Sequence, residues 1–255
     1  HPNRIREGGT CPGRECRRTY KSLTGYSDMT TADLPVLAIL GGTGDLGTGL
    51  ARRWAQAGYQ VIIGSRTLEK AEAAVDDLRE VMAERGVGEV TVQAMENADA
   101  ARAADIVTLT VPFSHQSSTL ESVRPALQGK ILIDVTVPLV PPKVARVQMP
   151  QEGSAGQIAQ ELLGEDVSVV SAFQNVAAAH LQEGKGVECD VLVCGNKKAA
   201  REEVIKLVEA AGMRGFHAGM INNAAAAEAL TSVLIVINKQ YGCHAGIKIS
   251  GLGDA

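Results

Sequence analysis

The sequence predicts an α/β fold built on a doubly wound parallel sheet, followed by a smaller C-terminal α/β domain. From Leu34 onward, short apolar runs alternate with segments whose apolar residues recur at helical spacing. The first run, Val36 to Leu40, leads into glycines that open a helix. Strands that are joined by helices imply right-handed crossovers and a parallel sheet covered on both faces.

The first predicted domain, residues 34–150, alternates apolar runs with helical patterns. We expect strands at 36–40, 59–63, 90–94, 105–111 and 131–135, and helices at 45–57, 68–86, 98–104 and around Leu120 to Leu127. Prolines between residues 136 and 153 disrupt both patterns, so we expect a domain boundary or a long functional loop there.

The second predicted domain covers residues 151–255. We expect helices at 154–163 and 198–211, strands at 167–173 and 189–195, and a long apolar helix after Asn222. A helix that is apolar all round has to be buried, either between domains or against a second subunit. The stretch from Ala224 to Ile237 therefore favours a homodimer.

Residues 1–33 differ from the rest of the chain. They are rich in Arg and Gly and lack both an apolar period and the apolar segment of a secretory signal, so we expect a disordered or artefactual extension. Cys11 and Cys16 lie in this extension, but two further ligands at zinc-binding spacing are missing. No metal site is predicted.

Composition narrows the partners and the location. A net charge of −4 provides no basic field that would attract nucleic acid. The longest apolar stretch falls short of the roughly 20 residues of a membrane span and contains Glu228, so we expect no membrane partner. The 5 cysteines form an odd set that suits a reducing compartment, which predicts a cytoplasmic protein.

The glycines after the first strand predict a dinucleotide site. Gly42 permits the tight turn, Gly44 lets the backbone approach a pyrophosphate, and Gly47 lets the helix pack on the sheet. The phosphates would lie on free N–H groups at the helix start. The loop residues Thr43 and Leu46 belong to this site, and Asp45 is expected to point aside as a helix cap.

The end of the second strand predicts NADP rather than NAD. An NAD enzyme places Asp or Glu there for the ribose hydroxyl, but this chain has Gly64 and Ser65. Arg66 offers a planar fork for a 2′-phosphate, and Lys70 lies one helical turn later. The alternative is that both cations are ordinary surface residues.

Several stretches resemble the F420-dependent NADP reductases. They are "LAILGGTGDLGTGLARRWAQAGYQVIIGSRTLEKAEA", "TLTVPFSH", "VVSAFQNVAA", "DVLVCG" and "GIKIS", so the similarity covers nearly the whole chain after Leu34. The resemblance implies reversible hydride transfer between NADP(H) and the deazaflavin coenzyme F420, in a cleft between a Rossmann domain and a smaller domain. It assigns the NADP contacts to Thr43, Gly44, Ser65, Arg66 and Lys70.

Direct hydride transfer between two cofactors needs orientation rather than a protein nucleophile, so no catalytic residue is predicted. The cleft floor is expected at Val111, Pro112, Phe113 and His115, because ligands collect at the carboxyl ends of parallel strands. His115 is equally well explained as a helix-start residue bonded to backbone groups.

A second segment, around Gln174 and Asn175, follows another strand. Their amides could bind the pyrimidine edge of the deazaflavin, or simply cap the loop. His180 is expected on a helix surface. Lys185, Lys239 and Lys248 could meet the anionic tail of F420, but scattered lysines do not define a site.

Two other functions share the first half of the pattern. One is an NADP-dependent reductase of a small imine or carbonyl compound, which would need a proton donor near its substrate. The other is a non-catalytic NADP-sensing protein.

Overall fold

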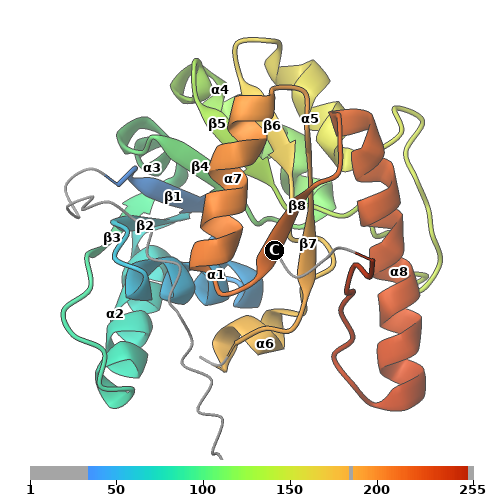
Figure 1. Ribbon diagram of the computed structural model, residues 1–255. Helices are drawn as coiled ribbons and strands as arrows, with labels where there is room; N and C mark the ends of the chain where they lie inside the picture. Colours follow the sequence, from blue (N-terminus) through green and yellow to red (C-terminus); the bar gives the residue numbers. More distant parts are fainter. Residues whose placement is uncertain (1–33, 184–185, 252–255) are drawn as a thin grey trace, which may run out of the picture.

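The computed structural model describes residues 34–183 and 186–251 and contains one eight-stranded sheet (Figure 1). The strand order is β3-β2-β1-β4-β5-β6-β7-β8. All neighbours are parallel except β6 and β7, which are antiparallel. The strands are β1 (Leu37–Leu40), β2 (Val61–Ser65), β3 (Val92–Glu96), β4 (Ile106–Leu109), β5 (Ile131–Asp134), β6 (Ser168–Ser171), β7 (Asp190–Gly195) and β8 (Arg214–His217).

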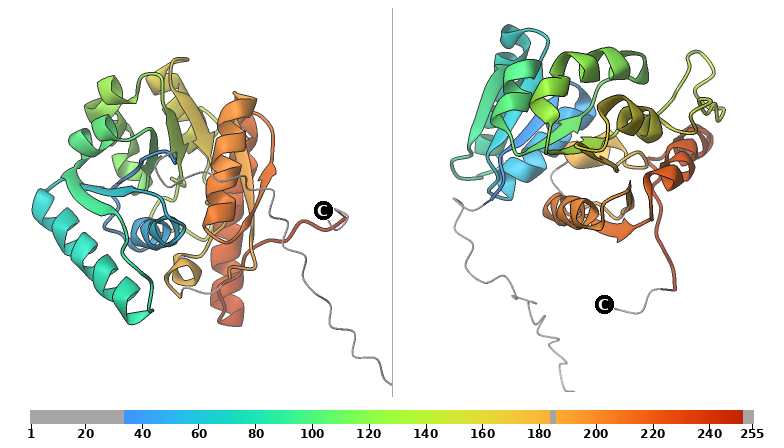
Figure 2. Two further views of the ribbon diagram at one scale, coloured as in Figure 1. Left: turned by 60° about the vertical axis from the view of Figure 1, so that its left-hand side comes forward. Right: turned by 90° about the horizontal axis from the view of Figure 1, so that it is seen from above.

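Helices cover both faces of the sheet, which confirms the doubly wound arrangement (Figure 2). One face carries α1 (Asp45–Gln56), α2 (Leu68–Glu84) and α7 (Lys198–Ala210), and the other carries α3 (Asn97–Ala103), α4 (Gln116–Leu127) and α5 (Ala155–Leu163). The short α6 (Ala178–Gln182) packs on α1, and α8 (Ala224–Tyr241) lies along α5 and β7. Single 3₁₀ turns occur at Phe113–His115 and Ile221–Asn223.

Strand β1 lies at the centre of the core. Leu37 and Ile39 join the apolar cluster beneath α1, α2 and α7, whereas Ala38 and Leu40 join the cluster on the opposite face. All four side chains are at most 1% exposed. Because both faces are buried, this strand is a continuous apolar run rather than an alternating one.

The sheet continues across the predicted domain boundary at residue 150. Strand β6 pairs in parallel with β5, from Ser168 opposite Ile131 to Ser171 opposite Asp134. The division into two domains therefore stays a prediction. The predicted extension at 1–33, with Cys11 and Cys16, lies outside the described residues.

Strand β8 was not expected from the sequence, whereas α6 is the helix on whose surface His180 was expected. Strand β8 reads Arg-Gly-Phe-His, which has no apolar run to reveal it. It is held at the sheet edge by pairing with β7 and by Arg214, whose Nε and Nη2 each donate to Asp190 at 2.8 Å. Tertiary pairing stabilises a strand that its own residues do not favour.

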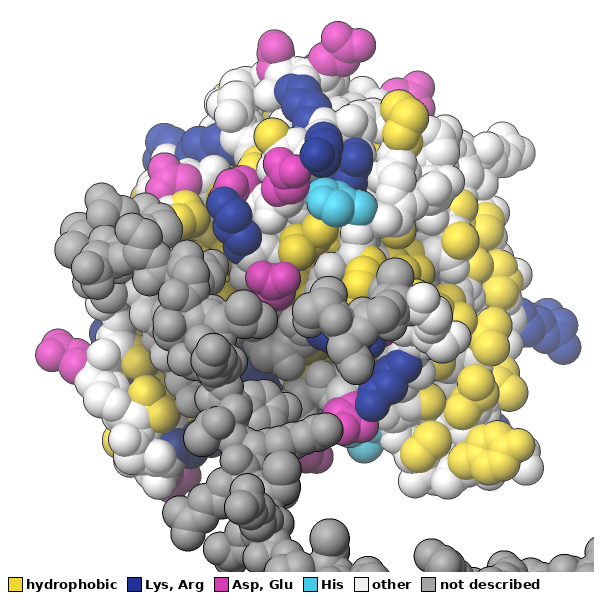
Figure 3. Space-filling model, in the orientation of Figure 1, with side chains coloured by type: hydrophobic (Ala, Val, Ile, Leu, Met, Phe, Trp, Pro, Cys, Tyr) yellow, Lys and Arg dark blue, Asp and Glu magenta, His cyan; other side chains and the backbone are white. Residues whose placement is uncertain are grey.

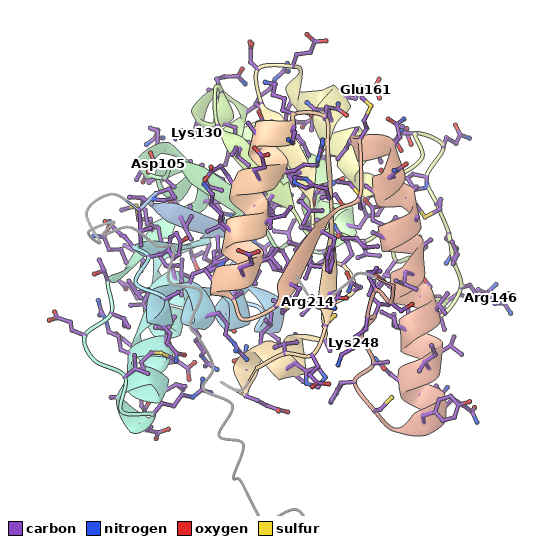
Figure 4. All side chains as sticks on the ribbon, viewed as in Figure 1. Asp105, Lys130, Arg146, Glu161, Arg214 and Lys248 are labelled. Carbon is purple, nitrogen blue, oxygen red and sulfur yellow. The ribbon has the colours of Figure 1, made fainter. Side chains whose placement is uncertain are left out.

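The proline-containing segment between β5 and α5 is a long loop that rests on α8. The hydroxyl of Ser232 donates to the carbonyl oxygens of Val144 at 2.9 Å and Arg146 at 3.3 Å. In Figure 4, Arg146 lies on this loop at the outer edge, beside α8. The loop is thereby fixed to the helix at its middle.

Helix α8 is only partly buried within this chain, so its predicted burial against a second subunit stays a prediction. Val233 and Val236 are 46% and 47% exposed. Of the described helices, only Ile221–Tyr241 is long and apolar enough to cross a membrane, a test that core helices of soluble proteins also pass. Its one carboxylate, Glu228, is turned inward and is 1% exposed.

Glu228 joins α8 to the start of α5. Its two carboxylate oxygens accept hydrogen bonds from the backbone N–H groups of Ala155 at 2.7 Å and Gly156 at 3.0 Å. Burial nevertheless raises the pKa of Glu228 from 4.5 to about 8, and the nearby Asp134 adds to the rise. The neutral form is therefore favoured in the folded protein relative to the unfolded chain.

We predict that Glu228→Gln flattens the pH dependence of stability between pH ~6 and ~8. In the wild type the unfolding free energy falls as pH rises through this window, because the unfolded chain has already lost a proton that folded Glu228 keeps. The slope from one proton is at most about 1.4 kcal/mol per pH unit. Urea unfolding at several pH values measures it. Equal slopes in both proteins would contradict the predicted shift.

Candidate functional site

The glycine loop lies at the carboxyl end of β1, where the strand order reverses between β1 and β4. Such a reversal leaves a crevice in which α/β proteins bind ligands. The loop is tied to β2, because the N–H of Gly42 donates to the carbonyl of Gly64 at 3.0 Å. Gly41 has a positive φ of 69°, a conformation that favours glycine.

The three motif glycines have different surroundings. A Cβ on Gly42 would lie 2.7 Å from the carbonyl oxygen of Ile39, and one on Gly47 would lie 2.7 Å from the Cα of Gly42. A Cβ on Gly44 would instead meet its nearest atom at 4.0 Å. Gly42 and Gly47 are thus required for packing, whereas Gly44 faces open space where a ligand can approach.

Helix α1 begins without a side-chain cap. Its N-cap is Gly44, and no side chain bonds the amides of the first turn. The expectation that Asp45 caps the helix is wrong, since Asp45 is one residue too late and occupies the first turn, where a carboxylate is favourable. The amides of this turn are placed to receive an anion.

The predicted basic pair lies at the end of β2 and the start of α2. Ser65 is buried at 5% exposure, while Arg66 and Lys70 are exposed. Within 34–183 and 186–251, neither cation has a hydrogen-bond or ion-pair partner. Lys70 lines a cavity of about 530 Å³ together with Thr43 and Asp45.

The segment after β4 comes close to the glycine loop. The side chain of Val111 packs on Gly41 so closely that a Cβ there would lie 2.5 Å from its Cγ1. Pro112 and His115 are exposed, and Phe113 is half-buried. His115 occupies the N-cap position of α4, and its backbone N–H donates to the carbonyl of Pro112 at 2.8 Å. The exposed His115 ring is compatible with both predictions, that it lines the cofactor site and that it is a helix-start residue bonded to backbone groups.

Gln174 and Asn175 are turned inward. Gln174 Nε2 donates to the carbonyl of Asp134 at 2.8 Å, and Asn175 Nδ2 donates to the carbonyl of Asp190 at 2.7 Å. The two residues are 5% and 2% exposed. In this geometry the side chains brace the turn after β6, which is the loop-capping alternative, and do not present donors to a ligand.

Helix α6, which follows that turn, is fastened to α1. Gln182 Nε2 donates to the carbonyl of Asp45 at 2.6 Å and to Thr48 Oγ1 at 2.8 Å. Leu181 contacts Gly49 so closely that a Cβ on this glycine would lie 2.7 Å from Leu181 Cβ. His180 lies on this helix, and its Nε2 is 2.8 Å from the carbonyl oxygen of His244. The turn after β6 is therefore joined to the helix that carries the glycine loop.

A buried polar cluster between the end of β5 and the first residue of α4 was missed by the sequence analysis. Gln116 Nε2 lies 2.6 Å from Asp134 Oδ2, 2.9 Å from Thr136 Oγ1 and 2.9 Å from the carbonyl of Ala155. Burial raises the pKa of Asp134 to about 6. The sequence feature that could have indicated this cluster is Asp134, an acidic residue at the carboxyl end of β5. The cluster fixes the start of α5 but is closed to solvent.

The lysines considered for an anionic tail are not gathered into a site. Lys248 Nζ lies 2.8 Å from Glu188 Oε2, and Figure 4 shows Lys248 below Arg214. Lys239 belongs to the last turn of α8, and Lys185 lies outside the described residues. No group of three metal-ligating side chains occurs in the part of the chain that the structure describes.

The sequence of this chain is similar to those of known oxidoreductases. Residues 36–138 match the family model described as NADP oxidoreductase, coenzyme F420-dependent. The F420-dependent NADP reductase of Methanocaldococcus jannaschii is 40% identical over 222 residues, which cover 85% of this chain and 98% of the relative. The enzyme of that name from Methanothermobacter thermautotrophicus is 40% identical over 225 residues, covering 86% and 96%.

Solved structures of other proteins share the fold of this chain. A protein from Arthrobacter, provisionally assigned as an F420-dependent NADP reductase, superimposes with a TM-score of 0.70 and 26% identity, over 85% of this chain and 100% of the other. An imine reductase from Myxococcus stipitatus has a TM-score of 0.52 and 20% identity over 82% and 63%, which shows a shared fold alone. With 40% identity across almost the full length of curated relatives, this chain belongs to the F420-dependent NADP reductase family.

Proposed function

We propose that this chain transfers a hydride reversibly between NADP(H) and coenzyme F420. The observation that carries the proposal is the 40% identity with F420-dependent NADP reductases, which covers both halves of the chain. When bound, the two cofactors supply the redox chemistry, since the hydride passes directly between their rings. The protein has to bind, orient and shield them.

The residues present fit NADP. Gly44 leaves space at the start of α1, and the first-turn amides there are uncapped by a side chain. Arg66 and Lys70 are two exposed cations without a partner among the described residues, and Lys70 shares a cavity with Thr43. These groups would hold the pyrophosphate and the 2′-phosphate.

For the second ring we assign the turn after β4 and the turn after β6. Val111, Pro112, Phe113 and His115 follow a strand at the same sheet edge as the glycine loop. Phe173 begins the other turn with a φ of 72°, an uncommon conformation for a residue other than glycine. Since Gln174 and Asn175 hold this turn from inside, its backbone is the part that faces the cleft.

The decisive experiment adds NADPH to purified protein with authentic F420 and follows the loss of the visible absorbance of F420. An imine or carbonyl reductase and an NADP-sensing protein would both leave F420 unchanged, which would reject the proposal. Direct NADPH binding, measured alongside, separates those two outcomes from an inactive preparation.

We predict that Gly44→Ala and Gly47→Ala fail in different ways. The nearest atom to a methyl group at 44 is 4.0 Å away, so stability should be unchanged while NADPH binding falls about tenfold or more. A methyl group at 47 clashes with backbone, so the melting temperature should fall as well. Thermal unfolding and NADPH titration measure both. Equal loss of stability in the two variants would contradict this assignment.

Replacing Arg66 and Lys70 together by Ala should weaken NADPH by about 10²-fold or more while changing NADH little, because only NADPH carries the 2′-phosphate. Arg79→Ala is the control for loss of positive charge on α2, since Arg79 is exposed and its guanidinium donates to the carbonyl of Val92 at 3.0 Å. Dissociation constants for both nucleotides provide the test. An equal loss for NADH and NADPH would show that the pair does not recognise the phosphate.

A homodimer through α8 is part of the proposal. Hydrophobic side chains gather over this helix in Figure 3, and exposed Val233, Val236 and Tyr241 belong to it. Exposed Val147 lies on the loop that Ser232 fixes to the same helix. A continuous apolar surface of this kind marks an interface.

Val233→Asp with Val236→Asp should convert the dimer to a monomer, because burying two carboxylates against an apolar partner is unfavourable. Leu68→Asp, an exposed apolar position on α2 at 44% exposure, should leave the dimer intact. Sedimentation equilibrium measures the mass. A monomeric wild type, or a variant that remains dimeric, would contradict the interface.

We also place the protein in a reducing compartment such as the cytoplasm. Cys189 and Cys194 are buried and free, and Cys243 is exposed and free. Burial raises the pKa of Cys194 to about 11, which keeps its thiol protonated and unreactive.

A further inference from the structure

Asn97 connects strand β3 to the glycine loop. It is the first residue of α3 and directly follows β3. Its side-chain Oδ1 accepts a hydrogen bond from the backbone N–H of Gly41 at 3.3 Å. One carboxamide thus reaches from the third strand of the first half to the turn that begins the nucleotide loop.

The same carboxamide takes the space of a side chain at the end of β2. A Cβ on Gly64 would lie 2.9 Å from Asn97 Oδ1, which is closer than real Cβ atoms come to other atoms, and 3.2 Å from the carbonyl oxygen of Ile39. Gly64 therefore does more than leave out the acidic residue of NAD enzymes, because its lack of a side chain makes room for Asn97. A side chain at this position is incompatible with Asn97 where it stands.

The carboxamide of Asn97 beside Gly64 affects which nucleotide the site can bind. Dinucleotide folds that use NAD place a carboxylate at the end of the second strand, where it binds the ribose hydroxyl. Here the neighbouring Ser65 is 5% exposed, and the space beside Gly64 holds a neutral carboxamide. A carboxylate in that space would repel a 2′-phosphate, whereas a carboxamide does not.

The Nδ2 group of the Asn97 carboxamide is available to bind a ligand. Asn97 is half-buried, and its Nδ2 group makes no hydrogen bond within residues 34–183 and 186–251. An amide nitrogen of this kind carries two donors and no charge. It can serve a phosphorylated ribose in the way a carboxylate serves an unphosphorylated one.

We propose that Asn97 is a specificity-determining residue that favours NADP(H) over NAD(H). Its Oδ1 fixes the glycine loop through Gly41. Its Nδ2, placed beside Gly64, donates to the phosphorylated ribose. The proposal rests on the proposed function only for the presence of NADP(H), and it adds a neutral donor to the basic pair Arg66 and Lys70.

Asn97→Asp separates the two roles of the side chain. Aspartate keeps an oxygen for the N–H of Gly41 but adds a negative charge, so the dissociation constant for NADPH should rise about tenfold or more, with that for NADH changed less than about threefold. Asn97→Ala loses the bond to Gly41 and should weaken both nucleotides. Gly64→Ala, which displaces the carboxamide without adding charge, should resemble Asn97→Ala.

Gln93→Glu is the matched control. It adds the same charge at an exposed position on β3, four residues earlier and about 13 Å away along the strand, so neither nucleotide should respond. Binding is measured by direct titration, with no F420 present. Thermal unfolding establishes that each variant is folded at the titration temperature.

Two outcomes would overturn the proposal. If Asn97→Asp weakens NADPH and NADH by the same factor, the residue positions the loop without selecting the nucleotide. If Asn97→Asp and Gly64→Ala leave both constants unchanged, the carboxamide does not act on the nucleotide. Failure of the proposed function is distinguishable, since the wild type would then bind NADPH but leave F420 unreduced.

Discussion

The position of the nucleotide loop depends on how closely helix α1 approaches strand β1. A Cβ on Gly47 would lie 2.7 Å from the Cα of Gly42 and 2.9 Å from Thr110 Oγ1, so any larger residue would push the helix away from the sheet. The free amides of the first turn would move with it. This contact lies where the strand order reverses between β1 and β4. It therefore sets both the width of the crevice there and the position of the first-turn amides of α1.

Features that depend on neighbours in the sequence were predictable, and features that depend on distant partners were not. The glycine spacing and the missing acid at Gly64 could be recognised because strand, turn and helix follow one another directly. The inward orientation of Gln174 could not, because its amide bonds the carbonyl of Asp134, which lies 40 residues earlier. The contact between Asn97 and Gly41 likewise spans 56 residues.

Helix α8 shows why composition alone misjudges burial. Its apolar residues suggested full enclosure, yet Val233 and Val236 face outward while Glu228 and Ser232 are buried. The polar residues are inside because each has a backbone partner there: Glu228 accepts from the first amides of α5, and Ser232 donates to the long loop. Satisfied hydrogen bonds compensate for the burial of the polar groups. Apolar periodicity contains no information about such partners.

Helix α6, which follows the turn after β6, is joined to helix α1 by the buried side chain of Arg53. Arg53 of α1 donates through Nε to the carbonyl of Leu181 at 3.1 Å and through Nη2 to that of His180 at 2.8 Å. Burial lowers the pKa of Arg53, so separating α6 from α1 would leave a poorly solvated cation without these acceptors. The turn after β6 therefore moves with the nucleotide helix. Direct hydride transfer requires two rings at a fixed short separation, and in the proposed arrangement this shared frame would maintain that separation.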